Sequence, residues 1–364
     1  MELPSLQIRS VRARAVNAPI ITPLITSRGS VDVAPLLLVD VETEEGVTGH
    51  GYAFCYMDLA APFLVSVIER IDEMVRGEAA DPRFLYKSLR GRFTLVGTEG
   101  SLGMALSAFD IACWDACAKA AGLPLYKLLG SNRNTIPAYN SKGLSLKEPA
   151  ELADEALALL GEGFKAVKLR LGRRDVMADR EAAKVVREAV PAGTVVMVDY
   201  NQALTPEDMI GRLALLEKFD PAWIEEPVRH DDFLGCARIK AASRIPIQLG
   251  ENFNSPAVMA AAIHIEACDY AMPDIGRIGG VSGWLEAARI ADAADMAMSS
   301  HLYPEVSVHV LAATPTCHYL EYVDWAEPVL QTPITIKDGQ AIIPDTPGLG
   351  LEWDEEAVAR YRLD

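Results

Sequence analysis

Apolar and polar residues follow two different patterns along the chain, and the change falls near residue 134. Residues 7–55 form apolar runs joined by turn residues, which predict strands, and helical patterns follow over 60–76 and 102–121. The second helical pattern stops at a glycine and a nearby proline, as helices usually do. These elements predict an N-terminal α+β domain over residues 1–133.

From residue 134 short apolar runs alternate with helical segments rich in Ala, Leu and Glu. The predicted strands lie within 165–172, 194–202, 222–227, 245–252, 268–274, 296–302 and 316–322. Repeated βα units predict a parallel sheet covered by helices, and so many in succession favour a closed barrel. An open doubly wound sheet is the alternative, but the glycine-rich phosphate loop that usually follows its first strand is absent. We therefore assign residues 134–325 to a barrel.

The remaining segment, residues 326–364, combines a hairpin-like pattern with turn residues, and we expect it to return to the N-terminal domain. The chain has no apolar run of about 18 residues or more, so the sequence predicts no membrane span. The first residues carry charges where a secretory signal would have an apolar core, which favours a cytoplasmic location.

Charge narrows the choice of partners. The formal net charge is −17 and the isoelectric point is about 4.8, which argues against nucleic acid and anionic membranes as partners. If the ligand is instead a small anion such as a carboxylate, the site must contain local positive charge or a bound cation.

Three acidic residues, Asp199, Glu225 and Glu251, end three consecutive predicted strands, and each is 26 residues from the next. The carboxyl ends of barrel strands meet at one face, where barrel enzymes place their active sites. Three carboxylates there would repel one another unless a cation lay among them, and an all-oxygen ligand set selects Mg²⁺ first and Mn²⁺ second. The alternative is scattered surface acids, but the flanking runs are apolar. The spacing therefore predicts a metal site.

The next two predicted strands end in Asp274 and His301. A single histidine is more often structural than catalytic. His301 differs because it ends an apolar strand whose neighbour ends in an acid. A carboxylate bonded to an imidazole fixes its tautomer and raises its basicity, as a general base requires. We predict a base formed by this pair.

Lys168 and Arg170 are two residues apart on one predicted strand, so their side chains project to the same face. On the inner face these two cations could bind a carboxylate, or one could act as a base. The alternative is a solvated basic run, since Arg173 and Arg174 follow. We expect the inner face.

Several stretches together resemble the mandelate racemase subgroup of the enolase superfamily, over essentially the whole chain. They are SAFDIACWDACAKAAGLPLYKLLG, VDYNQ, WIEEP, GEN, MPDIGRIGG, MSSHLYPEVSVH and HYLEY. The resemblance implies an α/β protein of enolase-like fold, with an N-terminal α+β capping domain over a modified (β/α)7β barrel of the TIM type. It also implies a symmetric homo-oligomer, of which an octamer is one form.

The resemblance also implies roles for individual residues. The three acids would hold Mg²⁺, which binds the substrate carboxylate, and His301 would take or return the alpha proton on one face. Glu321 would hydrogen-bond the carboxylate as it becomes an enediolate. Lys168 and Ser141 would contact the carboxylate, and Asn201 would lie near the alpha-hydroxyl.

Two residues depart from the subgroup's pattern. Arg170 stands where mandelate racemase has the lysine that serves as its second base, and arginine stays protonated under nearly all conditions. Arg28 lies in the capping loop 22–35, where the racemase is apolar. A cation there suggests a polar or anionic distal group on the substrate, unless the side chain points into solvent.

Three interpretations of function follow. Proton removal by His301 and loss of a hydroxyl would make the chain a dehydratase (a lyase) of a hydroxy or sugar acid. Racemisation or epimerisation of a mandelate-like 2-hydroxy acid needs proton exchange on both faces, which a charged Arg170 disfavours. A binding or regulatory protein that has lost catalysis is the third interpretation, but it gives no reason to retain the pair of Asp274 and His301. We favour the dehydratase.

Overall fold

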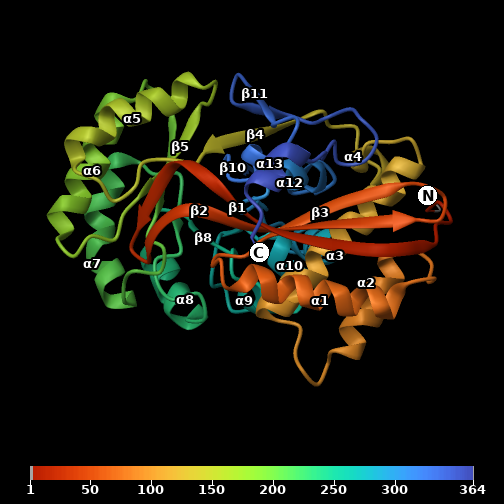
Figure 1. Ribbon diagram of the computed structural model, residues 1–364. Helices are drawn as coiled ribbons and strands as arrows, with labels where there is room; N and C mark the ends of the chain where they lie inside the picture. The colour runs from red at the N-terminus through yellow and green to blue at the C-terminus, as the bar shows by residue number, and fades with distance from the viewer. Residues whose placement is uncertain (1–2, 364) are drawn as a thin grey trace.

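The N-terminal domain is an antiparallel sheet with helices packed against it (Figure 1). The computed structural model describes residues 3–363. The elements of this domain are β1 (Ile8–Thr26), β2 (Gly29–Thr43), β3 (Thr48–Phe54), α1 (Ala60–Val75), α2 (Pro82–Arg92), α3 (Gly100–Ala120) and α4 (Leu125–Leu128). Helix α1 buries Leu64, Ile68, Ile71 and Val75, whose spacing places them on one face. Helix α3 is buried along most of its length because it lies between this sheet and helices of the barrel.

Strand β3 and helix α3 approach each other closely at two glycines, Gly49 and Gly51. A Cβ atom at Gly51 would collide with the carbonyl oxygen of Ala108 and lie 2.8 Å from the amide nitrogen of Ala112. A Cβ atom at Gly49 would collide with the Ala112 carbonyl oxygen. Glycine usually weakens a strand, so these positions are explained by backbone proximity.

The second domain is a closed barrel of parallel strands. Its assigned strands are β4 (Thr135–Asn140), β5 (Ala166–Arg170), β6 (Val195–Asp199), β7 (Ile224–Glu225), β8 (Ile247–Leu249), β9 (Tyr270–Ala271) and β10 (Leu320–Tyr322). Parallel pairing runs without a break from β4 to β9, and β10 pairs in parallel with β4. Met298 completes the ring through parallel bridges to Ala271 on one side and Cys317 on the other.

Seven helices alternate with the strands and cover the outside of the barrel (Figure 1). They are α5 (Pro149–Gly161), α6 (Val176–Ala189), α7 (Pro206–Leu216), α8 (Phe233–Ala242), α9 (Pro256–His264), α11 (Gly280–Ala293) and α12 (Pro304–Ala312). Short turns α10 (Ile275–Ile278), η1 (Glu217–Phe219) and η2 (Glu327–Val329) join these elements. Among residues 3–363, no helix of this ring follows β10, so the barrel is of the predicted (β/α)7β type. In the described part of the chain, no helix is long and apolar enough to cross a membrane.

Helices α6 to α9 each begin at a side chain that accepts a hydrogen bond from an amide of the first turn. These residues are Asp175, Thr205, Asp232 and Ser255. Such caps satisfy amides that have no partner within the helix, and they set where each helix starts.

The C-terminal segment contacts both domains. Strands β11 (Thr335–Lys337) and β12 (Gln340–Ile342) form a hairpin, and β12 pairs antiparallel with β4 of the barrel. Helix α13 (Glu355–Arg360) follows, after which the Tyr361 carbonyl accepts from the Asn17 amide at 2.8 Å. The segment therefore extends the barrel sheet before it reaches β1.

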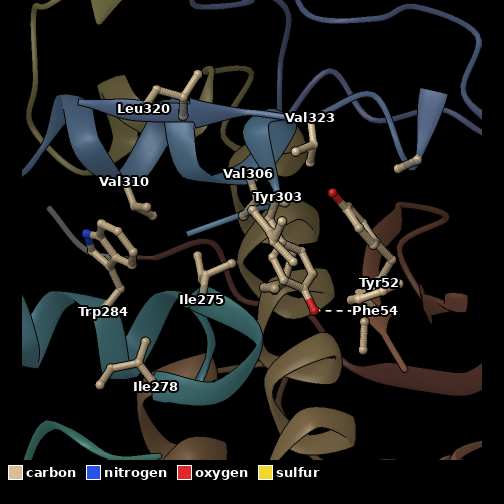
Figure 2. Close-up of a cluster of buried hydrophobic side chains, with 14 of the residues drawn as sticks. Tyr52, Phe54, Ile275, Ile278, Trp284, Tyr303, Val306, Val310, Leu320 and Val323 are labelled. Carbon is tan, nitrogen blue, oxygen red and sulfur yellow. Dashed lines mark hydrogen bonds between the residues drawn. The ribbon is translucent and has the colours of Figure 1, made fainter. Parts of the chain in front are cut away.

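The two domains share a core at one side of the barrel (Figure 2). Tyr52 and Phe54 of β3 pack against Tyr303, and the rings of Tyr52 and Tyr303 are 4.9 Å apart. The Phe54 amide donates to the Tyr303 hydroxyl at 2.8 Å, and the Tyr52 hydroxyl donates to Glu305 at 2.6 Å. Strand β3 is thereby fixed to the chain that follows His301.

We predict that Gly51→Val lowers the free energy of unfolding by about 1–3 kcal/mol, because the side chain must displace the backbone of α3. Strand propensity alone predicts the opposite change, since valine favours strands. Gly91→Ala in α2 is the control, because its Cβ atom would meet nothing within 4 Å and alanine favours helices. Thermal unfolding monitored by circular dichroism checks both, and a Gly51→Val protein as stable as the parent contradicts the prediction.

Candidate active site

A cavity of about 330 Å³ lies at the carboxyl ends of the barrel strands, beside the hairpin that joins β1 to β2. Most of the predicted site residues line it: Arg28, Lys168, Arg170, Asp199, Asn201, Glu251, His301 and Glu321. The other three, Ser141, Glu225 and Asp274, are buried and hydrogen-bonded to residues that line it. The fold therefore brings the predicted metal ligands, the predicted base and the predicted substrate-binding residues to one site.

The centre of the site is the ammonium group of Lys168, which contacts three carboxylates. Its Nζ atom lies 2.6 Å from Glu225, 2.7 Å from Glu321 and 3.1 Å from Asp199. The four residues come from β5, β6, β7 and β10, and all four side chains are almost completely buried. Lys168 thus points into the barrel, as the alternation along its strand predicts.

One ammonium group cannot balance three buried carboxylates. Burial, together with the charges of Asp199 and Glu321, raises the pKa of Glu225 to about 8 against the opposing effect of Lys168. Burial also acts on Glu321, but Lys168 and His301 hold its pKa down at about 2. The cluster therefore favours a second positive charge.

Glu251, the third predicted metal ligand, lies at the edge of this cluster. One carboxylate oxygen is 3.5 Å from Nε2 of His301, and the other accepts from the Asn252 amide group at 3.1 Å. In these side-chain positions, no three acidic, thiol or imidazole groups among residues 3–363 are close enough together to hold an ion. The chemistry of the ligands nevertheless fits Mg²⁺, because Asp199, Glu225 and Glu251 offer only oxygen and carry excess negative charge.

His301 and Asp274 form the predicted pair. Nδ1 of His301 is 2.7 Å from one carboxylate oxygen of Asp274, and the other oxygen accepts from the Gly276 amide at 2.7 Å. The carboxylate is held at both oxygens, so it orients the imidazole with Nε2 toward Glu251 and the cavity. Burial alone would lower the pKa of His301, but Glu251, Asp274 and Glu321 together raise it to about 9.

The two residues after His301 have left-handed backbone conformations, with φ of 50° at Leu302 and 51° at Tyr303. Two consecutive residues of this kind are costly for side chains larger than glycine. The turn directs the Leu302 amide to Glu321, which accepts its hydrogen bond at 2.9 Å. Because Tyr303 is held by Phe54, strand β3 of the capping domain stabilises the turn that positions the site.

Arg170 is buried, yet it forms no ion pair with the described residues. Its guanidinium donates to the Gly143 carbonyl at 2.7 Å, to the Ser141 carbonyl at 2.9 Å and to the Ser141 hydroxyl at 3.2 Å. Within the structure as described, its Nε atom is buried without a hydrogen-bond partner. A fixed, uncompensated positive charge therefore faces the cavity.

Arg28 lies at the rim of the cavity, at the tip of the hairpin between β1 and β2. Its Nε and Nη2 atoms donate to the carbonyls of Asn201 and Gln202 at 3.2 and 3.0 Å. The adjacent Ser27 hydroxyl donates to the Asn201 carbonyl at 2.9 Å. The hairpin is thus joined to the loop after β6, and the guanidinium forms part of the cavity wall.

The cavity wall also contains a cluster of hydrogen-bonded polar side chains that were not predicted from the sequence. Glu226 is buried with φ of 37°, and it accepts from Gln202 at 2.8 Å and from Asn252 at 2.9 Å. Arg277 donates to Asn252 at 2.7 Å and lies over the ring of Tyr56. A signal was available, since Gln202, Glu226 and Asn252 each directly follow a predicted site residue in the sequence.

Comparison with known proteins identifies the family. Residues 8–130 match the N-terminal domain of the mandelate racemase and muconate lactonizing enzymes, and residues 151–357 match the enolase C-terminal domain-like model. The chain belongs to the mandelate racemase and muconate lactonizing enzyme family of the enolase superfamily. The resemblance seen in the sequence and the predicted fold class are both confirmed.

Individual relatives match nearly the whole chain. An enolase from the alphaproteobacterium bal199, crystallised with magnesium, is 43% identical over 98% of this chain and 100% of its own, with a TM-score of 0.96. A Bradyrhizobium enolase complexed with magnesium and mandelic acid is 41% identical over 100% of both chains, with a TM-score of 0.95. The 3,6-anhydro-alpha-L-galactonate cycloisomerase of Streptomyces coelicolor is 32% identical over 98% of this chain and 99% of the relative. The curated relatives include dehydratases, cycloisomerases and racemases.

We predict that Asp274→Asn lowers the pKa of His301 by about one to two units, because it removes a charge-assisted hydrogen bond of about 1.5–3 kcal/mol. An NMR titration of the histidine rings in metal-free protein measures the change. His309 is the internal control, since it is buried elsewhere and burial lowers its pKa to about 4. An unchanged His301 titration in the variant would show that Asp274 does not support its protonation.

Proposed function

We propose that this protein is an Mg²⁺-dependent dehydratase that removes the alpha proton of a 2-hydroxycarboxylate through an enediolate intermediate. The observation that carries the proposal is that two basic residues of the cavity wall, His301 and Arg170, differ in their ability to exchange a proton. His301, oriented by Asp274, carries an imidazole that can take up and return a proton, whereas Arg170 presents a fixed cation. One base suffices for dehydration, while racemisation requires proton exchange on both faces.

Asp199, Glu225 and Glu251 would hold the metal ion. Two observations support this assignment: the buried carboxylates exceed the available positive charge, and related structures contain magnesium. When bound, Mg²⁺ would polarise the substrate carboxylate and stabilise the second negative charge that develops on it. Mn²⁺, which also accepts oxygen ligands, is the second candidate.

The protein's own residues would carry out the proton transfers. Nε2 of His301 takes the alpha proton, and the electron pair of the broken C–H bond moves into the carboxylate. Lys168 stabilises the charge where it appears, as a cation, and Glu321, which it contacts at 2.7 Å, holds the ammonium group in place. His301 then returns its proton to a hydroxyl on the neighbouring carbon, which leaves as water, and the resulting enol tautomerises to a 2-keto acid.

Polar groups at the rim support a sugar acid as the substrate. Arg28 and Arg277 line the cavity and are well placed for hydroxyl or carboxylate groups at the distal end of an extended substrate. An L-talarate dehydratase of 30% identity is complexed with magnesium and L-glucarate. Asn201, which lines the cavity, would bind the alpha-hydroxyl, and Ser141 would lie beside the carboxylate, behind Arg170, whose guanidinium donates to its hydroxyl at 3.2 Å.

Racemisation of a 2-hydroxy acid is the second candidate, because the Bradyrhizobium relative is complexed with mandelic acid. It would require Arg170, or another group on the same side of the cavity, to exchange a proton with the substrate. Arginine stays protonated under nearly all conditions, and the guanidinium of Arg170 is held by hydrogen bonds to two carbonyls, which argues against this role.

We predict that His301→Asn lowers kcat by at least about 100-fold, because it removes the base and keeps a side chain of similar polarity. His264→Asn, at an exposed position in α9, is the matched control and should retain parental activity. The assay is formation of 2-keto acid from a library of sugar acids and 2-hydroxy acids. Magnesium-dependent thermal stabilisation should persist in both variants. A His301→Asn enzyme as active as the parent would refute His301 as the base.

Incubation in D₂O separates the two reaction types. For the parent, we expect a 2-keto product and no deuterium in substrate of inverted configuration. Arg170→Lys restores a group that can lose its proton, so we expect this variant to show some inverted, deuterated substrate. Deuterium incorporation with inversion in the parent itself would contradict the one-base mechanism and support the racemase.

A further inference from the structure

We propose that Trp223 is a positioning residue whose indole N–H fixes the carboxylate of Glu225 for metal binding. The inference rests on the proposed magnesium site and adds a residue to it. Trp223 precedes Glu225 by two positions, so both side chains project into the barrel, with the indole one layer below the carboxylate. Both residues have an exposed fraction of 0%.

The two carboxylate oxygens of Glu225 have different surroundings. Oε1 accepts a hydrogen bond from the ammonium group of Lys168 at 2.6 Å. This oxygen therefore faces the centre of the site. Oε2 accepts from Nε1 of Trp223 at 3.2 Å, and this is its one hydrogen bond to the described residues. A buried carboxylate oxygen without a donor is unfavourable. The indole N–H therefore stabilises the orientation in which Oε2 faces Trp223 and Oε1 faces Lys168 and the proposed metal site.

The indole ring is itself held in place. Tyr139 packs edge-on against it at 5.6 Å between ring centres, and His318 and Tyr319 lie at 5.6 and 5.8 Å. Rotation of Trp223 would require these rings to move. Its N–H is therefore directed at Oε2 before any ion binds, which is how partners of metal ligands raise affinity.

The test is the magnesium affinity of Trp223→Phe, which keeps a buried aromatic ring and removes the N–H. Trp284→Phe is the matched control, because Trp284 is equally buried and its indole donates to Thr314 at 3.0 Å in another part of the barrel. Titration calorimetry of the metal-free, full-length proteins with MgCl₂ gives the dissociation constants. We expect Trp223→Phe to bind about 10–100-fold more weakly than the parent, and Trp284→Phe to match the parent within twofold.

A second measurement does not depend on whether Trp223→Phe folds. In parent protein labelled with ¹⁵N-tryptophan, we expect the Trp223 indole resonance to shift on addition of MgCl₂ and the Trp284 resonance to stay in place. The inference is overturned if folded Trp223→Phe binds magnesium as tightly as the parent. It is also overturned if the Trp223 resonance does not shift while the parent binds magnesium. A parent protein that binds no magnesium in the calorimeter instead overturns the proposed function, and the inference with it.

Discussion

The structure depends on how the barrel tolerates a cluster of buried negative charge. Asp199, Glu225 and Glu321 surround a single ammonium group, and water reaches almost none of them. Charges removed from water are costly unless paired and hydrogen-bonded. The parallel barrel makes the cluster possible because its strands end at one face and deliver a side chain each to a common point. The same concentration of charge that costs stability gives the site its affinity for a cation.

The capping domain is part of this arrangement. Strand β3 binds Tyr303 and Glu305, and so stabilises a turn with two unfavourable backbone conformations. That turn aims the Leu302 amide at Glu321. The close approach of β3 to α3 at Gly51 holds the strand in place from its other side. Packing in the capping domain therefore helps to position the carboxylate of Glu321 in the barrel, through the contacts of β3 with Tyr303 and of Leu302 with Glu321.

Features that depend on periodicity were predictable from the sequence. The equal spacing of Asp199, Glu225 and Glu251 reflects one βα unit each, and the alternation along β5 places Lys168 and Arg170 inside the barrel. Features that depend on contacts between distant residues were not. The sequence contains no signal that the ammonium group of Lys168 would contact Glu225 directly, or that Glu251 would turn toward His301. These positions follow from the distances between strand ends, which only the closed barrel defines.

In the proposed reaction, the groups that remove the alpha proton differ from the groups that decide the following step. In the first step, His301 with Asp274 would supply the base, and Lys168 with the bound metal ion would stabilise the resulting charge, whatever the rest of the 2-hydroxycarboxylate. The outcome depends on groups that do not take part in that first step. Arg170 donates to two carbonyls of the loop after β4, which hold its guanidinium in place. Because arginine stays protonated under nearly all conditions, it can attract an anion but is a poor proton acceptor. Under the proposed mechanism, arginine in place of lysine at position 170 would therefore change which second step the same intermediate can follow.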